Sequence, residues 1–213
     1  MTDDSNLVLK AHSLQAESPR IVLASQSAAR RGLLESAGLA ISCQPASVDE
    51  ATVKRECREA GLDVDATALT LARAKAARIV APDAIVIGAD QMLSCNGEWF
   101  DKPEDLERAR AQLMRLRGQV HVLHTAVVVM RDGVEVWRHI ARPCLWMRNF
   151  SEEFLDSYLR LEGDAVLSCV GAYRLEGPGL HLFARIEGDH DAILGLPVLP
   201  LLEFLREQGT VRT

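Results

Sequence analysis

Two serines and two arginines lie close together near the start of the chain, and their types and spacing suit the binding of an anion. Ser25 and Ser27 follow an apolar, strand-like run, and Arg30 and Arg31 fall on the opening turns of a predicted amphipathic helix. Backbone N–H groups at a helix N-terminus bind anions, and guanidinium groups match phosphate oxygens in planar pairs. The segment therefore predicts a phosphate site. A serine-capped helix with two solvated arginines is the structural alternative, because Ser is a common N-cap.

A carboxylate follows a strongly apolar segment further along the chain. Residues 84–89 have the near-continuous apolar pattern of a buried strand, and Asp90 and Gln91 come directly after it. In open α/β sheets, ligands bind beyond the carboxyl ends of the strands, so we expect Asp90 to serve in metal binding or in base chemistry. A turn-forming aspartate is the alternative, since Asp is common in turns.

A lysine stands directly before a proline in the segment Asp101-Lys102-Pro103. The residue before a proline is held in an extended or turn conformation, which directs the Lys102 ammonium out of a loop. The segment therefore offers a further cation for an anionic ligand. A solvated lysine is the alternative, and the segment taken alone favours it.

Other combinations of reactive side chains are weaker. His121 and His124 fall on opposite faces of a predicted strand, so they cannot share a metal ion. Cys169 and a distant histidine have the residue types of a nucleophile pair, but nothing nearby in the sequence supports that pairing. The motifs that carry the chemistry of kinases, serine hydrolases and zinc proteases are absent from the sequence.

Strand and helix patterns alternate along the chain and define what must position these residues. A helix starts near Ala28, an Asn-Gly hairpin signal follows the strand before Asp90, and Pro103 opens another helix. Ser151 caps a further helix, and a last one follows Pro197. We expect helices on both sides of a mixed sheet, which is an α/β architecture. The predicted strands are 21–24, 41–44, 84–89, 120–130 and 134–146, and the longest predicted helices are 66–80 and 103–116.

The composition describes a folded, net-acidic chain. Its 213 residues are 48% hydrophobic and carry a formal charge of −6, and no apolar run is long enough to span a membrane. A general nucleic-acid binder needs a basic face, so we expect neither a nucleic acid nor a membrane as a stable partner. The five cysteines are scattered and form no CxxC pair, which is typical of reduced thiols in the cytoplasm.

The sequence predicts one domain after a short extension. Residues 1–18 are polar and acidic rather than basic and apolar, so they do not read as a secretory signal, and we expect a flexible N-terminal extension. No linker or repeat interrupts residues 19–213, for which we expect a single domain. Two lobes within that domain are compatible with the pattern.

Several short motifs, taken together and in order, resemble the Maf family of nucleoside triphosphate pyrophosphatases. Each motif is weak alone, but their order makes the resemblance specific, and it covers the chain from about Ile21 to its end. The motifs are Leu-Ala-Ser25-Gln-Ser27 with Arg30-Arg31, Val48-Asp49-Glu50, Leu71-Ala-Arg-Ala-Lys75-Ala, Ile87-Gly-Ala-Asp90-Gln91, Asp101-Lys102-Pro103, Gly171-Ala-Tyr173 with Glu176-Gly177, and Gly195-Leu-Pro197.

The resemblance implies an elongated, mixed-sheet α/β fold related to that of inosine triphosphate pyrophosphatases, with two lobes around a cleft. It also implies hydrolysis of a nucleoside triphosphate to the monophosphate and pyrophosphate, assisted by Mg²⁺ or Mn²⁺, in a homodimer that clears unwanted nucleotides. Two alternatives remain. One is a phosphohydrolase that releases orthophosphate, and the other is a nucleotide-binding regulator of cell division without strong catalysis.

The resemblance further implies roles for particular residues. Asp90 is expected to be the proton acceptor and, together with Glu50, a metal ligand. The remaining cations and hydroxyl groups are expected to hold the triphosphate. The catalytic lysines are Lys75 and Lys102, and the substrate-binding residues are Ser25, Ser27, Arg30 and Arg31.

Three positions are expected to select the nucleobase, namely Ala29, Gln91 and Glu176. Gln91 and Glu176 resemble the branch of the family that acts on 7-methyl-GTP, whereas the branch that acts on dTTP and UTP carries Thr and Gln there. Ala29 departs from the Arg or Trp usual in the family and predicts a roomier pocket with broader tolerance. We therefore expect 7-methyl-GTP as the preferred substrate, with dTTP or UTP as the alternative.

Overall fold

The computed structural model describes residues 14–213, so the part of the expected extension before Leu14 lies outside the described residues. The strands are β1 Arg20–Leu23, β2 Ile41–Cys43, β3 Ala84–Cys95, β4 Glu98–Phe100, β5 Val120–Arg131, β6 Val134–Ala141, β7 Cys144–Met147 and β8 Phe183–Glu187. The α-helices are α2 Ala28–Ser36, α3 Glu50–Glu59, α4 Val64–Ala77, α5 Leu106–Leu116, α6 Glu152–Glu162, α7 His190–Ile193 and α8 Val198–Glu207. The 3-10 helices are η1 Gly163–Ser168 and η2 Pro178–Leu182.

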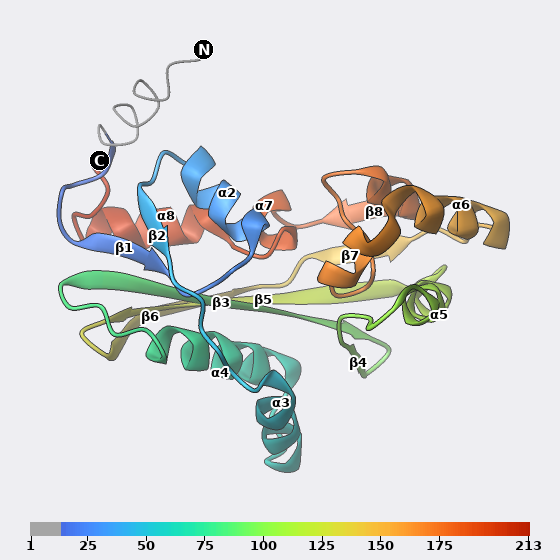
Figure 1. Ribbon diagram of the computed structural model, residues 1–213, viewed down its shortest axis with the longest axis horizontal. Coiled ribbons are helices and arrows are strands. Elements are labelled where there is room, and N and C mark those ends of the chain that lie inside the picture. Colours follow the sequence, from blue (N-terminus) through green and yellow to red (C-terminus); the bar gives the residue numbers. More distant parts are fainter. Residues whose placement is uncertain (1–13) are drawn as a thin grey trace. The chain divides into compact units, whose positions relative to one another are not determined.

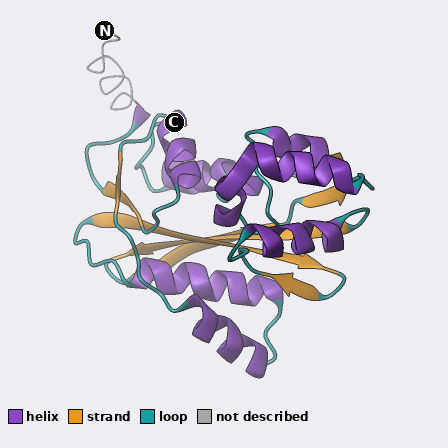
Figure 2. Ribbon diagram, turned by 45° about the vertical axis from the view of Figure 1, so that its right-hand side comes forward, coloured by secondary structure: helices purple, strands orange, loops and turns teal. Residues whose placement is uncertain are grey.

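The described residues form one mixed sheet with helices between its strands. Its eight strands within residues 14–213 follow the order β2-β1-β3-β5-β7-β8, with β4 beside β3 and β6 beside β5. Along the chain, groups of one to three strands alternate with groups of helices (Figure 1 and Figure 2). The predicted α/β class with a mixed sheet is confirmed. None of the helices within residues 14–213 combines the length and the apolar character needed to cross a membrane.

The described chain divides into two compact units. Unit 1 comprises the residues up to Asp90, Thr125–Ile140 and Leu194–Thr213, and unit 2 comprises Gln91–His124 and Ala141–Ile193. Both β3 and β5 contribute residues to each unit. The division into two compact units does not test whether residues 19–213 form a single domain, so that expectation stays a prediction.

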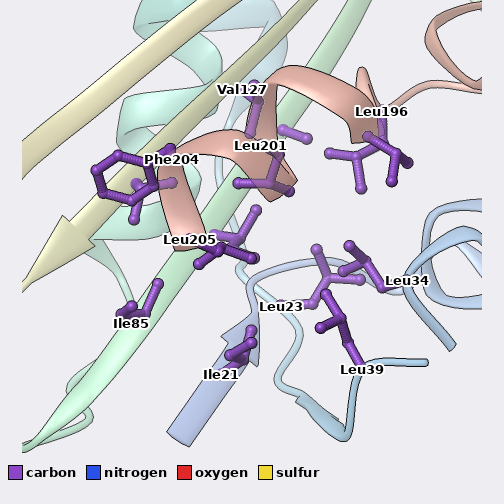
Figure 3. Packing of buried hydrophobic residues seen from close by; sticks show 14 of the residues in the cluster. Ile21, Leu23, Leu34, Leu39, Ile85, Val127, Leu196, Leu201, Phe204 and Leu205 are labelled. Carbon is purple, nitrogen blue, oxygen red and sulfur yellow. The ribbon is translucent and has the colours of Figure 1, made fainter. Parts of the chain in front are cut away.

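Unit 1 buries an apolar core on one face of its strands. β1 lies between β2 and β3 and pairs in parallel with both. Ile21 and Leu23 of β1 point to the same face, because side chains alternate along a strand. Leu34 of α2 and Leu201 of α8 pack against that face (Figure 3). Burying each such side chain stabilises the fold by about 1.5–3 kcal/mol relative to leaving it exposed.

The opposite face of β3 packs closely against α4, which runs along it on the side away from α8 (Figure 1). A Cβ atom added to Gly88 of β3 would lie 2.2 Å from the backbone oxygen of Ala72 and 2.8 Å from the backbone nitrogen of Ala76. Gly88 has no side chain, and the two facing residues of α4 have small ones. These three residues therefore allow the helix to approach the strand much more closely than larger side chains would.

β3 is longer than the sequence predicts. The apolar pattern predicts a strand that ends at Ala89, but β3 continues to Cys95. It continues because the chain turns at Asn96 and Gly97 and returns as β4, which pairs antiparallel with the end of β3. These two residues have φ of 52° and 81°, as a tight hairpin turn requires, so the Asn-Gly hairpin is confirmed. Asp90 therefore lies inside a strand, and its predicted place at the strand's carboxyl end is wrong.

The helix predicted to open at Pro103 begins later. α5 starts at Leu106 because the side chain of Asp105 caps it, accepting a hydrogen bond from the N–H of Arg108 at 2.7 Å. The cap predicted for the next helix is confirmed, since the Ser151 hydroxyl accepts from the N–H of Phe154 at 3.2 Å at the start of α6.

Two further segments differ from the prediction. The single long strand predicted for residues 134–146 is divided into β6 and β7 at Pro143. Proline has no N–H to donate to a neighbouring strand, which explains the division. The helix α3 is not in the prediction. Its sequence is strongly charged and buries only Cys57, so its apolar periodicity is weak, although Asp49 caps it by accepting from the N–H of Thr52 at 3.0 Å.

Residues 14–18 belong to the expected extension, and they lie against the C-terminal segment of unit 1. Gln15 forms an isolated β-bridge with Val211, and the N–H of Ala16 donates to the carbonyl of Thr210 at 2.9 Å. The Gln15 side chain also accepts a hydrogen bond from the N–H of Ala40 at 2.8 Å. The described part of the extension is thus hydrogen-bonded to the rest of unit 1.

Unit 2 builds its part of the sheet from antiparallel pairs. β7 pairs with the start of β5 on one side and with β8 on the other. The helices α5 and α6 contact each other, and Arg110 of α5 forms ion pairs with Glu152 at 2.7 Å and Asp156 at 3.0 Å. Tyr158 of α6 is buried.

The close approach of α4 to β3 predicts that Gly88→Ala destabilises unit 1 strongly. The added methyl group overlaps the backbone of α4, and overpacking of this kind costs about 1–3 kcal/mol or more. The matched control is Gly32→Ala in α2, where an added Cβ meets nothing within 4 Å. That change is expected to raise the free energy of unfolding by up to about 1 kcal/mol, because Ala is the better helix former. Chemical denaturation measures both, and equal stability of Gly88→Ala and wild type would contradict the packing argument.

Candidate active site

Three charged side chains of unit 1 converge where α4 lies against β3. The Lys75 ammonium donates to Oδ1 of Asp90 at 2.6 Å and lies 2.7 Å from Oε1 of Glu50. Lys75 comes from α4, Asp90 from β3, and Glu50 is the first residue of α3. Asp90 and Gly88 share one face of β3, since alternate residues of a strand point the same way. The close contact at Gly88 therefore sets the distance between Lys75 and Asp90.

Asp90 also lies just beyond the end of the neighbouring strand. The paired residues of β1 and β3 end at Leu23 and Ile87, and the N–H of Ala24 makes one more hydrogen bond to the carbonyl of Ile87 at 2.8 Å. The chain after β1 then turns toward α2 through Ser25. Asp90 therefore lies near the carboxyl end of β1, the parallel neighbour of β3. It does not lie at the carboxyl end of its own strand, β3.

The environment of Asp90 combines burial with charge. The residue is 4% exposed. Burial raises the pKa of its carboxyl group above the ordinary value, Lys75 and Arg30 act in the opposite direction, and Glu50 adds to the rise. Two nearby cations favour the ionised form that a proton acceptor needs, while burial makes that form more basic. Perturbed carboxyl groups of this kind are common at catalytic sites.

Arg30 joins three separate segments of unit 1 through its guanidinium group. Its Nε donates to the carbonyl of Gly195 at 2.8 Å, and its Nη1 donates to the carbonyl of Ala89 at 3.1 Å and to Oγ of Ser25 at 3.5 Å. Burial lowers the pKa of Arg30, and the charges of Asp90 and Glu50 oppose that shift. Arg30 is thus a positioned cation beside the acidic pair.

The hydroxyl groups and the second arginine have different environments. Ser27 caps α2, since its Oγ accepts from the N–H of Arg30 at 3.4 Å, and Oγ of Ser25 accepts from the N–H of Ser27 at 3.2 Å. The serine-capped helix is therefore confirmed, but Arg30 is half-buried and its guanidinium group is bound to backbone carbonyls. Arg31 is different. Its side chain is 60% exposed and pairs with Glu35 of the same helix at 2.7 Å, a hydrogen bond that raises its pKa.

The carboxylates of Glu50 and Asp90 suit a hard divalent cation. Both offer oxygen atoms, which Mg²⁺ and Mn²⁺ prefer, and both already lie around a single positive charge on Lys75. Among the described residues, no group of three or more His, Cys, Asp or Glu side chains gathers to hold a metal. A two-carboxylate site fits Mg²⁺, which commonly takes its remaining ligands from water and substrate phosphates.

The positions expected to select the base belong to both units. Ala29 lies in the first turn of α2 in unit 1 and is half-buried, whereas Gln91 and Glu176 belong to unit 2. The amide nitrogen of Gln91 donates to the carbonyls of Ala192 and Ile193 at 3.1 Å and 3.0 Å, which fixes its orientation. Glu176 is exposed.

The charges of Lys102 and Glu176 both affect the pKa of one thiol of unit 2, that of Cys169. Burial raises the pKa of Cys169, with Glu176 adding to the rise, while a hydrogen bond from Ser168 and the charges of Arg174 and Lys102 lower it. The side chains of Lys102 and Glu176 therefore approach the same part of unit 2. A thiol with a raised pKa carries little thiolate, so Cys169 does not have the character of a nucleophile.

Two features of the site were not found from the sequence. The first is the carbonyl of Gly195 as a partner of Arg30. Gly195 has a φ of 106°, and a Cβ atom added to it would lie 3.2 Å from Nε of Arg30. A glycine at this position therefore permits the hydrogen bond between its carbonyl and Arg30. The sequence signal is the Gly195-Leu-Pro197 motif, which marks the segment without indicating its contact with Arg30. The second is a buried hydrogen bond between Nε2 of His121 and the hydroxyl of Tyr173 at 2.8 Å, for which the sequence offers no local signal.

The sequence is similar to curated proteins over most of its length. A family model described as Maf-like protein matches residues 20–208. A protein of Granulibacter bethesdensis named nucleoside triphosphate pyrophosphatase is 54% identical over 190 residues, 88% of this chain and 96% of that protein. One of Gluconobacter oxydans with the same name is 52% identical over 193 residues, 89% of this chain and 95% of that protein. A 7-methyl-GTP pyrophosphatase of Rhizobium johnstonii is 47% identical over 195 residues, 91% of this chain and 98% of that protein.

Proposed function

This chain belongs to the Maf family, and on that premise we propose that it is a nucleoside triphosphate pyrophosphatase. Water attacks the α-phosphorus of the substrate, and pyrophosphate leaves while the nucleoside monophosphate remains. The observation that carries the proposal is the group of Lys75, Asp90 and Glu50, in which two carboxylates meet at one ammonium. The printed names of the relatives, nucleoside triphosphate pyrophosphatase and 7-methyl-GTP pyrophosphatase, support the same reaction.

Asp90 is the proton acceptor in this proposal. Lys75 orients its carboxylate through Oδ1, and burial raises its basicity, so it takes a proton from the attacking water more readily than an exposed aspartate does. Lys75 then has a second task. Its ammonium keeps Asp90 and Glu50, two like charges, close together before substrate arrives.

Glu50 and Asp90 are also the proposed ligands of Mg²⁺ or Mn²⁺. The triphosphate is strongly anionic, and these two carboxylates repel it unless positive charge lies between them. When bound, the ion supplies electrostatic stabilisation of the phosphate oxygens as negative charge moves to the leaving group. Asp90 therefore has two proposed roles, as metal ligand and as proton acceptor.

The remaining cations bind the phosphate chain. Arg30 is held by two backbone carbonyls, so its charge is already in place when substrate binds and little side-chain entropy is lost. Ser25 and Ser27 supply hydroxyl groups beside the N-terminus of α2, and Lys102 supplies a further ammonium. Arg31 must leave Glu35 before it binds a phosphate, so we assign it a smaller contribution than Arg30.

The role of Asp90 predicts that Asp90→Asn loses about 10²–10⁴ in kcat while the protein stays folded. Asparagine keeps the shape and still accepts a hydrogen bond from Lys75, but it cannot take up a proton. The control is Asp83→Asn, which makes the same chemical change at an exposed turn whose φ of 55° asparagine tolerates. Assays for pyrophosphate and orthophosphate measure the effect.

Near-normal turnover by folded Asp90→Asn would contradict the proposed base. Release of orthophosphate in place of pyrophosphate would indicate a different phosphohydrolase. Nucleotide binding without turnover would indicate a regulator of cell division, which is the other alternative.

The metal proposal predicts that EDTA abolishes activity and that added Mg²⁺ or Mn²⁺ restores it. Glu50→Gln removes one of the two carboxylates, so it is expected to raise the metal concentration needed for half-maximal activity by roughly tenfold or more. Full activity in EDTA would contradict a metal requirement. An unchanged metal dependence in Glu50→Gln would instead remove Glu50 from the site.

We propose that Glu176 and Gln91 select a modified purine, with 7-methyl-GTP as the preferred substrate. A carboxylate accepts hydrogen bonds from N1–H and the exocyclic amine of guanine together, whereas uracil offers one N–H between two carbonyls that a carboxylate repels. Methylation at N7 adds positive charge to the base, which favours Glu176 further. The small side chain of Ala29 leaves more room than Trp, so tolerance is expected to be broader.

Base selection predicts a ranking with 7-methyl-GTP above GTP and both above dTTP and UTP in kcat/KM. Glu176→Gln is expected to shift the ranking toward UTP and dTTP, because its amide donates to a uracil carbonyl. Glu153→Gln, the same change on the exposed side of α6, is the control and is expected to leave the ranking unchanged. A wild-type preference for dTTP or UTP, or an unchanged ranking in Glu176→Gln, would refute the assignment.

A nucleotide-pool role in the cytoplasm and a homodimer complete the proposal. All five cysteines lie in the described part of the chain as free thiols, which supports a reducing compartment. The dimer rests on the resemblance to the Maf family alone, and light scattering of the purified protein measures it.

A further inference from the structure

Unit 2 contains a buried histidine that no step of the proposed reaction uses. His121 of β5 is 1% exposed, and its Nε2 lies 2.8 Å from the hydroxyl of Tyr173. The two rings are tilted against each other with centroids 5.5 Å apart, and Phe183 packs edge-on to Tyr173 at 4.9 Å. The side chain of Tyr173 is therefore fixed at both its polar and its apolar parts.

The segment held by Tyr173 has a costly backbone conformation. Gly171 and Ala172 have φ of 83° and 58°, and the left-handed region costs an alanine about 1–2 kcal/mol. The Tyr158 hydroxyl donates to the carbonyl of Ala172 at 3.2 Å. A strained residue of this kind persists only where its surroundings determine it, and the strain often marks a functional segment.

Residues 171–177, the recognition loop, have a second anchor at Arg174. Arg174 pairs with Glu162 of α6 at 3.3 Å, and the Glu162 side chain is only 4% exposed. A Cβ atom added to Gly179 would lie 2.2 Å from the carbonyl oxygen of Arg174, so the chain after the loop folds back tightly onto it. Glu176 lies between these anchors and is itself exposed.

The protonation state of His121 indicates a positional role and not an acid–base role. Its Nδ1 is buried without a hydrogen-bond partner in the described chain. An orphaned N–H is rarer in proteins than an unpaired acceptor, so we assign the proton to Nε2, which donates to Tyr173. Burial lowers the pKa of His121 to about 4, so the ring stays neutral near pH 7.

We propose that the His121–Tyr173 hydrogen bond positions the recognition loop so that Glu176 reads the base, which makes His121 a positioning residue for substrate selectivity. This inference rests on the proposed role of Glu176. The hydrogen bond joins β5, a strand of the sheet, to a segment that has no strand or helix of its own between Gly171 and Gly177. Without it, the strained residues relax and the backbone that carries Glu176 is no longer held in place.

Four variants of the full chain test the proposal. Tyr173→Phe removes only the hydroxyl, and His121→Leu removes the donor. His121→Gln keeps an amide N–H near the position of Nε2 and is expected to rescue selectivity. His124→Leu is the matched control, because it breaks another histidine hydrogen bond of β5, between Nε2 and Oγ of Ser94 at 2.8 Å.

The readout is the ratio of kcat/KM for 7-methyl-GTP to that for UTP, with kcat and KM reported separately. We expect Tyr173→Phe and His121→Leu to lower the ratio roughly fivefold or more, chiefly through a raised KM for 7-methyl-GTP. His121→Gln and His124→Leu are expected to keep it within about twofold, whatever their effect on thermal stability. Equal losses on both substrates in folded Tyr173→Phe would overturn the proposal and leave a structural role.

A double-mutant cycle separates this inference from the base assignment itself. In a Glu176→Gln background, Tyr173→Phe is expected to change the ratio no further, because the group it positions is gone. If Glu176→Gln alone leaves the ratio unchanged, base selection by Glu176 is wrong and the positioning role falls with it. If Glu176→Gln changes the ratio and Tyr173→Phe does not, only the positioning role is overturned.

Discussion

The close packing of α4 on β3 is the contact on which the acidic centre of unit 1 depends. Glycine at position 88, facing Ala72 and Ala76, lets the helix lie against the strand with no side chain between them. Lys75 follows on the same face of the helix, and Asp90 follows Gly88 on the same face of the strand. Backbone geometry therefore places the two side chains within reach of each other, and they form an ion pair of 2.6 Å.

Burying a carboxylate in this place opposes folding, and the surrounding cations reduce that cost. A buried charge is tolerated when it is paired and hydrogen-bonded, as Asp90 is with Lys75. Arg30 contributes from a second direction while it joins α2 to the carbonyls of Ala89 and Gly195. The same residues thus hold unit 1 together and carry the charge to which we assign phosphate binding. Substitutions among them are expected to change stability and activity together, which is why matched controls are needed.

Unit 2 positions the loop that we propose selects the base by different physical means. A neutral hydrogen bond and aromatic contacts around His121 and Tyr173 hold a strained loop. The ion pair between Arg174 and Glu162 anchors the same loop to α6. No large net charge has to be buried for this. Such a scaffold suits discrimination between bases, which differ in the direction of a few hydrogen bonds, whereas the charged centre of unit 1 suits a phosphate chain.

The sequence by itself determined what depends on neighbouring residues. Membership of the Maf family, the mixed α/β class, the Ser151 cap and the Asn-Gly hairpin are all confirmed, because motifs, caps and turns are local. The tertiary structure alone decided which of two adjacent arginines joins distant segments of unit 1. Arg30 meets the carbonyl of Gly195, 165 residues away, whereas Arg31 meets Glu35 one helical turn away. Such contacts, like that of His121 with Tyr173, depend on segments that only folding brings together, and no local periodicity encodes them.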